Sequence, residues 1–166
     1  QSMNAAPTTL RTVLEVLEEI APLEYAEEWD NTGLLLEPVP AADQAVASIL
    51  LTIDLTQAVI AEACELQSQL VVAYHPLIFH PLNSLTQADS RHRSLMRAAK
   101  CDIAIYSPHT ALDAAPQGVN DWLADGLTPG RRVTINPSAG VESPDGTPGI
   151  GQGRLLELDD PLSLHR

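Results

Sequence analysis

The chain has 166 residues, of which 45% are hydrophobic, and this length and composition suit a folded domain with a buried core. Its formal net charge is −13, because 22 acidic residues outnumber 9 basic ones, and such a surface repels nucleic-acid backbones. No run of about 18 apolar residues is present, so no membrane-spanning helix is expected. The composition favours divalent cations or a basic protein as partners, and neither nucleic acid nor a membrane.

The start of the chain and its cysteines indicate the compartment. Residues 1–3 (Gln-Ser-Met) resemble the remnant of a cleaved tag, without the basic start and apolar run of a signal peptide. Cys64 and Cys101 share no CxxC spacing and lie among aliphatic residues, which favours buried free thiols over a disulfide. We therefore expect a reducing compartment: the cytoplasm, with the nucleus and the mitochondrion as open alternatives.

The first predicted element is a helix over residues 9–20. Thr8 or Thr9 can cap it, Ala21-Pro22 ends it, and its apolar residues recur at helical spacing: Leu10, Val13, Leu14, Leu17 and Ile20. A turn-prone cluster at residues 29–33 (Trp-Asp-Asn-Thr-Gly) then leads into an apolar run, and prolines mark a loop after it.

Short apolar runs then alternate with helical patterns. Three runs of strand length lie at residues 48–53, 70–74 and 102–106. Helices are predicted after Thr56, over residues 90–100 and, as a short helix, near residues 119–123. This alternation predicts an α/β fold with a mostly parallel sheet and helices packed on it.

The last third of the chain has a different character. Strands are expected at residues 131–135 and 154–158, separated by a Pro-, Gly- and Ser-rich stretch. We expect an α/β domain over residues 4–136, a flexible loop or linker over 137–150, and the start of a further strand and helix over 151–166. Because Asp160-Pro161 begins a helix that has only about one turn of chain left, we expect a fragment, a short isoform or a shortened protein.

Polar residues follow all three strands of the predicted sheet. Asp54 comes after the first strand, His75 after the second, and His109 with Asp113 after the third. In open parallel sheets, ligands bind outside the carboxyl ends of the strands, and these residue types bind divalent metals. The sequence thus predicts a ligand site at this edge.

Each of these residues also has a structural interpretation. Asp54 precedes a helix, where a cap or turn role is the simpler one. His75 is either a ligand or a core histidine. In the loop at residues 107–113, Thr and Asp side chains can form hydrogen bonds to the backbone of the loop itself.

The remaining histidines have weaker claims. His80 can close a pocket but suits the surface better, His92 suits a solvated helix face, and His165 receives no role. No Gly-rich phosphate loop, GxSxG motif or nucleophilic cysteine setting is present.

Three segments together carry a family resemblance. Residues 29–34 (WDNTGL), 74–79 (YHPLIF) and 106–113 (YSPHTALD, continuing to Gly118-Val119-Asn120) occur in the order and spacing of the Nif-three-like family. The chain resembles this family of GTP cyclohydrolase 1 type 2 homologues over about residues 9–160, in the form of its eukaryotic branch.

The resemblance implies an α/β fold assembled as a homo-oligomer, commonly a hexameric ring, with up to two divalent ions (zinc, iron or manganese) at the strand ends. It implies His75 as a metal ligand and Asp113 as a carboxylate that can bridge ions about 3.5–4 Å apart. Asp54, Tyr74 and His109 are further candidates to lie beside these ligands.

The chain departs from the family pattern in two ways. Tyr74 stands where many bacterial relatives have histidine, and a neutral phenol is a poor metal ligand. The family also supplies a further His and Glu from a C-terminal segment, whereas this chain ends soon after residues 151–155. We therefore expect weak or single-metal occupancy, unless a second chain completes the site.

Three functions remain open at this stage, and no catalytic residue is assigned. One is a dinuclear metal-dependent hydrolase acting on a nucleotide-like or heterocyclic substrate. The second is a metal-stabilised scaffold or regulator that works through protein partners. The third is a structural domain whose histidines are incidental. The fold alone does not choose between them.

Overall fold

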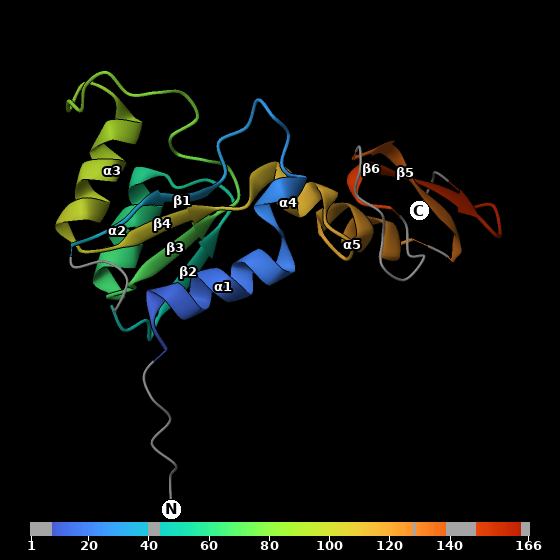
Figure 1. The fold of residues 1–166 in the computed structure, drawn as a ribbon, viewed down its shortest axis with the longest axis horizontal. Helices are drawn as coiled ribbons and strands as arrows, with labels where there is room; N and C mark the ends of the chain where they lie inside the picture. The colour runs from blue at the N-terminus through green and yellow to red at the C-terminus, as the bar shows by residue number, and fades with distance from the viewer. Residues whose placement is uncertain (1–7, 40–43, 128, 139–148, 164–166) are drawn as a thin grey trace, which may run out of the picture. The chain divides into compact units, whose positions relative to one another are not determined.

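The computed structural model describes residues 8–39, 44–127, 129–138 and 149–163. Its elements, labelled in Figure 1, are α1 (Leu10–Ile20), a 3-10 helix (Leu23–Tyr25), β1 (Gly33–Leu36), β2 (Ile49–Thr52), α2 (Gln57–Glu65), β3 (Leu70–Ala73), α3 (Ser90–Lys100), β4 (Ala104–Ser107), α4 (His109–Ala114), α5 (Val119–Asp125), β5 (Gly130–Pro137) and β6 (Gly151–Leu158). Two compact units result: residues 1–19 with 29–109, and residues 20–28 with 110–166.

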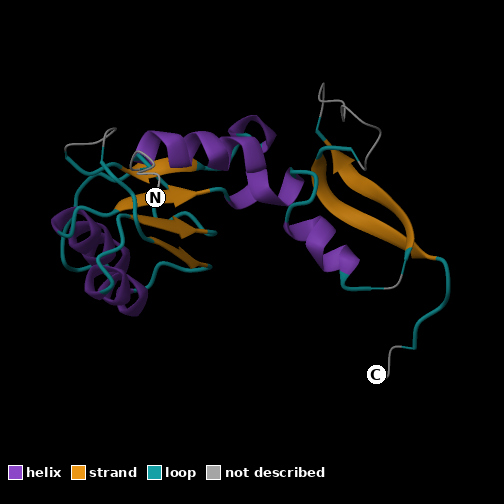
Figure 2. Ribbon diagram, turned by 90° about the horizontal axis from the view of Figure 1, so that it is seen from below, coloured by secondary structure: helices purple, strands orange, loops and turns teal. Residues whose placement is uncertain are grey.

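The first unit contains a four-stranded sheet in the order β1-β4-β3-β2. β2, β3 and β4 pair in parallel, and β1 adds to the edge of β4 in the antiparallel direction. The prediction of an α/β fold with a mostly parallel sheet is therefore confirmed, with the sheet mixed at one edge. Figure 2 shows α1 on one face of this sheet and α2 with α3 on the other.

The core lies between the sheet and the pair α2 and α3. Central strands β3 and β4 are almost fully buried, as expected when helices cover both faces, whereas edge strand β2 alternates between exposed and half-buried residues. The core side chains from these elements include Ile60, Ala63, Val71, Leu95, Ala98 and Ile105.

The helix boundaries follow local capping. Thr56 caps α2 by accepting a hydrogen bond from the amide of Val59, and Asp89 caps α3 through the amide of Arg91. The side-chain and backbone hydrogen bonds from Arg91 also lower the pKa of Asp89 below its usual value.

The predicted helices over 90–100 and near 119–123 are confirmed as α3 and α5. No helix in the described ranges is long and apolar enough to cross a membrane.

One helix departs from the expectation. Residues 109–113 were expected to form a loop, but they belong to α4. This helix has six residues, which is too short to show apolar periodicity in the sequence.

The second unit contains α4 beyond its first residue, α5 and the antiparallel pair β5 and β6. Asp121 is 4% exposed, and its carboxylate accepts hydrogen bonds from Nε of Arg154 at 2.8 Å and from Nη1 of Arg132 at 3.1 Å. The network links α5 to both strands of the hairpin.

Residues 159–163 continue from β6 without helical conformation. The expectations for residues 1–3, 139–148 and 164–166 lie outside the described residues.

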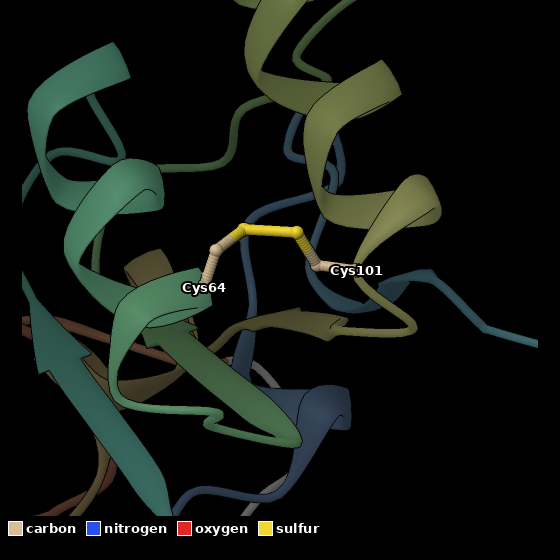
Figure 3. The surroundings of a disulfide bond; sticks show 2 residues. All are labelled: Cys64 and Cys101. Atoms are coloured by element: carbon tan, nitrogen blue, oxygen red, sulfur yellow. A yellow bond between two sulfur atoms is a disulfide. The ribbon is translucent and has the colours of Figure 1, made fainter.

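The two cysteines form a disulfide, so the prediction of free thiols is wrong. Cys64 near the end of α2 and Cys101 after α3 lie 5.9 Å apart between their Cα atoms (Figure 3). α2 and α3 run side by side on one face of the sheet, which brings together residues that are 37 positions apart in sequence. The inference of a reducing compartment therefore loses its basis.

We expect the Cys64→Ala/Cys101→Ala double variant to have a free energy of unfolding lower by about 3–4 kcal/mol. The physical reason is that the cross-link restricts the unfolded chain. Urea unfolding measures the change. A reductant should bring the wild type to the level of the double variant and leave that variant unchanged, and a wild type insensitive to reduction would contradict the expectation.

Asp121 should make the stability of the second unit depend on pH. Burial raises its pKa, but hydrogen bonds from Arg154, the amide of Gln117 and Arg132 outweigh burial, so the net pKa lies below the ordinary 3.8. A lowered pKa stabilises the fold above pH 3.8, and this stability is lost as pH falls through the folded-state value.

Asp121→Asn should therefore lower the free energy of unfolding at pH 7 by about 3–5 kcal/mol and flatten its dependence on acidic pH. Asp125→Asn is the matched control, because the Asp125 carboxylate also meets Arg132 but is 67% exposed, and it should cost well under half as much. An equal decrease in the free energy of unfolding in both variants would show that the buried network stabilises the fold no more than an exposed ion pair does.

Candidate functional site

The candidate site lies where β2, β3 and β4 end. Backbone pairing continues past the last residues of β2 and β3: the amide of Tyr74 donates to the carbonyl of Thr52, and that of His75 to Ile53. The buried hydroxyl of Ser107, at the end of β4, donates to the carbonyl of Tyr74 at 2.9 Å. These bonds hold the ends of the three strands next to one another.

His75 is paired with Asp54, which follows the neighbouring strand. Nδ1 of His75 lies 2.8 Å from Oδ1 of Asp54, and the side chains are 49% and 66% exposed. Nε2 of His75 has no hydrogen-bond partner in the part of the chain that the structure describes. His75 is therefore not a core histidine, and Asp54 is not the helix cap, since Thr56 has that role.

His109 forms a second pair of the same kind with Asp30. The Nδ1–Oδ1 distance is again 2.8 Å, but here the Asp30 side chain is fully buried and the His109 side chain is 17% exposed. The amide of Asn31 also donates to Oδ1 of Asp30 at 2.7 Å. The bond of His109 therefore reaches 79 positions back along the chain, and does not serve the local loop.

The two imidazoles are neighbours. Their ring centroids lie 5.6 Å apart, and the ring of Tyr74 lies 4.9 Å from His75 and 5.8 Å from His109. Trp29 and Phe79 each contact His109 edge-on at 6.3 Å, so an aromatic wall surrounds it. His109 also has a φ of 32°, a left-handed conformation that non-glycine residues rarely adopt.

A cavity of about 460 Å³ adjoins the exposed pair. His75 and Asp54 line it together with the first turns of α2 and α3, represented by Gln57, Ser90, Arg91 and Ser94. A small ligand that reaches His75 therefore has space beside it, bounded by hydroxyl, amide and guanidinium groups.

Four of the five expected site residues come together here, namely Asp54, Tyr74, His75 and His109. Asp113 belongs to the second unit, four residues after His109 in α4, and its backbone carbonyl accepts a hydrogen bond from Nδ2 of Asn120. Within the described ranges, no group of three or more His, Cys, Asp or Glu side chains has the arrangement of a metal site.

The other histidines stay outside this group. His80 is exposed and contacts Phe79, and Nδ1 of His92 in α3 accepts a hydrogen bond from the amide of Thr86. His165 lies outside the described residues.

Asp30 is the site residue that sequence reasoning missed. The cluster at residues 29–33 has the composition of a turn, and this local explanation hides a carboxylate whose partner is distant in sequence. The sequence signal was its place in the segment of residues 29–34 (WDNTGL), one of the three that carry the family resemblance.

The sequence profile of the family Duf34/NIF3 (NGG1p interacting factor 3) matches residues 8–166. The chain belongs to this family. The resemblance that the three motifs indicated is thus confirmed.

Similar proteins are found among eukaryotes and bacteria. NIF3-like protein 1 of Drosophila melanogaster is 42% identical over 154 residues, which cover 93% of this chain and 50% of the fly protein. The NIF3 homolog of Schizosaccharomyces pombe is 45% identical over 154 residues, or 90% of this chain and 54% of the yeast protein. The chain therefore spans about half the length of these relatives.

A solved structure supports the same assignment at the level of the fold. The crystal structure of a Bacillus cereus protein related to NIF3 superposes with a TM-score of 0.76 at 31% identity. The superposition covers 83% of this chain and 37% of the bacterial chain.

We expect both paired histidines to carry their proton on Nδ1 when the imidazole is neutral, because in each case this nitrogen faces a carboxylate. Long-range ¹H–¹⁵N NMR spectra distinguish the two tautomers. His92 is an internal control with the opposite tautomer, since its Nδ1 accepts a hydrogen bond.

Substitution of each carboxylate tests the pairing. Asp54→Asn should change the tautomer populations of His75 alone, and Asp30→Asn those of His109 alone. Unchanged spectra in both variants would show that the carboxylates do not orient the rings.

Proposed function

We propose that the chain is a metal-binding protein, with His75 as a ligand to a divalent ion such as zinc, iron or manganese, and Asp113 as a second ligand. The observation that carries the proposal is the His75–Asp54 pair: a carboxylate fixes Nδ1 and leaves Nε2 without a partner among the described residues. Metal-binding histidines commonly donate their other ring nitrogen to such a carboxylate.

The donor types present fit such an ion. Imidazole nitrogen and carboxylate oxygen both bind zinc, iron and manganese, and the His109–Asp30 pair offers a second oriented imidazole 5.6 Å from His75 between ring centroids. The number of ligands is small, because the described residues hold no group of three or more candidate donors. We therefore propose weak binding, with one ion rather than two.

In the longer relatives, we propose that this site belongs to a metal-dependent hydrolase with two ions, whose substrate is not assigned. A bound ion of this kind supplies Lewis acidity toward a substrate oxygen. In this chain, His75 would bind, Asp54 would orient it, and the cavity beside them would receive the substrate. A homo-oligomer, a hexameric ring by family resemblance, is part of the same proposal.

A second candidate is a regulator or scaffold that acts through protein partners. The family description names an interaction with NGG1p, and the net charge of −13 suits a basic partner. In that case a bound metal ion would raise the stability of the folded protein, and the protein would not turn over a substrate. The two candidates differ in whether the full-length protein hydrolyses any substrate in a His75-dependent way.

Metal titration of the purified chain tests the proposal. Zinc added after chelator treatment should raise the midpoint of thermal unfolding of the wild type, because a ligand of the folded state stabilises it. His75→Ala and Asp113→Ala should each weaken zinc binding by about tenfold or more.

His92→Ala is the matched control, because it removes an imidazole that bonds the amide of Thr86 and is not part of the candidate site. It should bind zinc as the wild type does. A wild type that takes up no zinc, or two site variants that bind it as tightly as the control, would refute the proposed site.

A further inference from the structure

The groove between α2 and α3 has a chemistry unlike the rest of this acidic chain. It encloses a cavity of about 550 Å³ whose lining includes Arg93, Arg97 and Lys100. The remaining lining residues are neutral, and none is acidic: Gln57, Ile60, Gln87, Met96 and Cys101. The chain has 22 acidic and 9 basic residues, so three bases without one acid is a strong local reversal of charge.

The helical spacing explains how these bases come together. Residues 93, 96, 97 and 100 recur at intervals of three and four, so they lie on one face of α3. This face is turned toward α2, which supplies Gln57 and Ile60. The disulfide of Cys64 with Cys101, drawn in Figure 3, joins the ends of the two helices, and Cys101 lines the groove.

The positive charge in the groove is not compensated by carboxylates. Arg93 donates a hydrogen bond to the backbone oxygen of Gln87. Nε and Nη2 of Arg93 also lie 2.9 and 2.8 Å from the side-chain oxygen of Gln57, when the Gln57 amide is turned so that its oxygen faces the guanidinium. Both acceptors are neutral. Arg97 and Lys100 have no side-chain hydrogen bond or ion pair to any described residue.

Basic side chains elsewhere behave differently. Of the eight that the structure describes, four pair with carboxylates: Arg91, Arg131, Arg132 and Arg154. Three of the other four line this single groove. The helix dipole favours cations in the last turn of α3, which suits Arg97 and Lys100, but it does not account for Arg93 or for the absence of acidic neighbours.

We propose that this groove is a binding site for a small organic anion that carries phosphate or carboxylate groups. Arg93, held in place by neutral acceptors, presents a fixed cation, and Arg97 and Lys100 close on the anion from the next turns of the helix. Guanidinium groups bind such oxygens in pairs, and the side chain of Met96 supports the apolar part of the ligand. The site is separate from the histidine pairs and does not depend on the proposed metal.

Calorimetric titration of the metal-free chain with inorganic pyrophosphate and, in a second arm, citrate tests the site. The Arg97→Gln/Lys100→Gln variant should bind the preferred anion at least about tenfold more weakly, since two charge-assisted contacts are removed. Both side chains are exposed, so the fold should persist, and an unchanged unfolding midpoint checks this. Tighter binding of pyrophosphate or of citrate identifies the phosphate or the carboxylate class.

Two controls separate this inference from the others. Arg131→Gln removes an exposed cation of the second unit and should leave anion binding unchanged. His75→Ala should also retain it, although this variant lacks a ligand of the proposed metal site. Equal affinity of wild type and Arg97→Gln/Lys100→Gln, or binding of an acidic peptide but of neither small anion, would overturn the proposal.

Discussion

The pairing of β3 with a parallel neighbour on each side is the constraint on which the candidate site depends. Ile49 pairs with Leu70, and Leu70 with Ala104, so β2, β3 and β4 end at one edge of the sheet. A shift of one residue in β3 would turn His75 to the opposite face of the sheet, because side chains alternate along a strand. The hydroxyl of Ser107 reinforces this register by bonding the backbone of Tyr74 just beyond the strand.

The two histidine–aspartate pairs have the same bond length but different surroundings. The Asp30 carboxylate is fully buried and accepts a hydrogen bond from the amide of Asn31 as well as pairing with His109. The imidazole ring of His109 is therefore held in one orientation among the aromatic side chains around it. Asp54 is 66% exposed, and its bond to His75 competes with water. The site thus combines a rigid imidazole with one that can adjust to a ligand, and the adjustable one lines the adjoining cavity.

Much of the first unit could be predicted from the sequence because its signals are local. Apolar runs of strand length, helical spacing and the cap at Thr56 predict β2 to β4 and their helices within a few residues. The six-residue α4 and the antiparallel pairing of β1 were not predicted, since neither leaves a periodic signal.

The contacts that the sequence did not reveal are those between distant segments. The disulfide of Cys64 with Cys101 and the bond of Asp30 to His109 both depend on how helices and strands pack. Asp54, Tyr74, His75 and His109 do lie near one another, because all follow parallel strands, whereas Asp113 belongs to the second unit. The pairing of Asp30 with His109 could not be predicted, because the two residues are 79 positions apart in sequence.

Gln57 lies between the cavity beside His75 and the groove that holds Arg93. It begins α2, lines the space beside His75, and also lines the groove in which its amide oxygen holds Arg93. An anion that takes over Arg93 would release this amide toward the cavity of His75, while the disulfide keeps α2 and α3 in place. This exchange gives up the two hydrogen bonds that Gln57 accepts from the Arg93 guanidinium, and a hydrogen bond to a charged group is worth about 1.5–3 kcal/mol. Gln57 is therefore the side chain through which occupation of the groove would change the affinity of the cavity beside His75, and the reverse change would be equal in size.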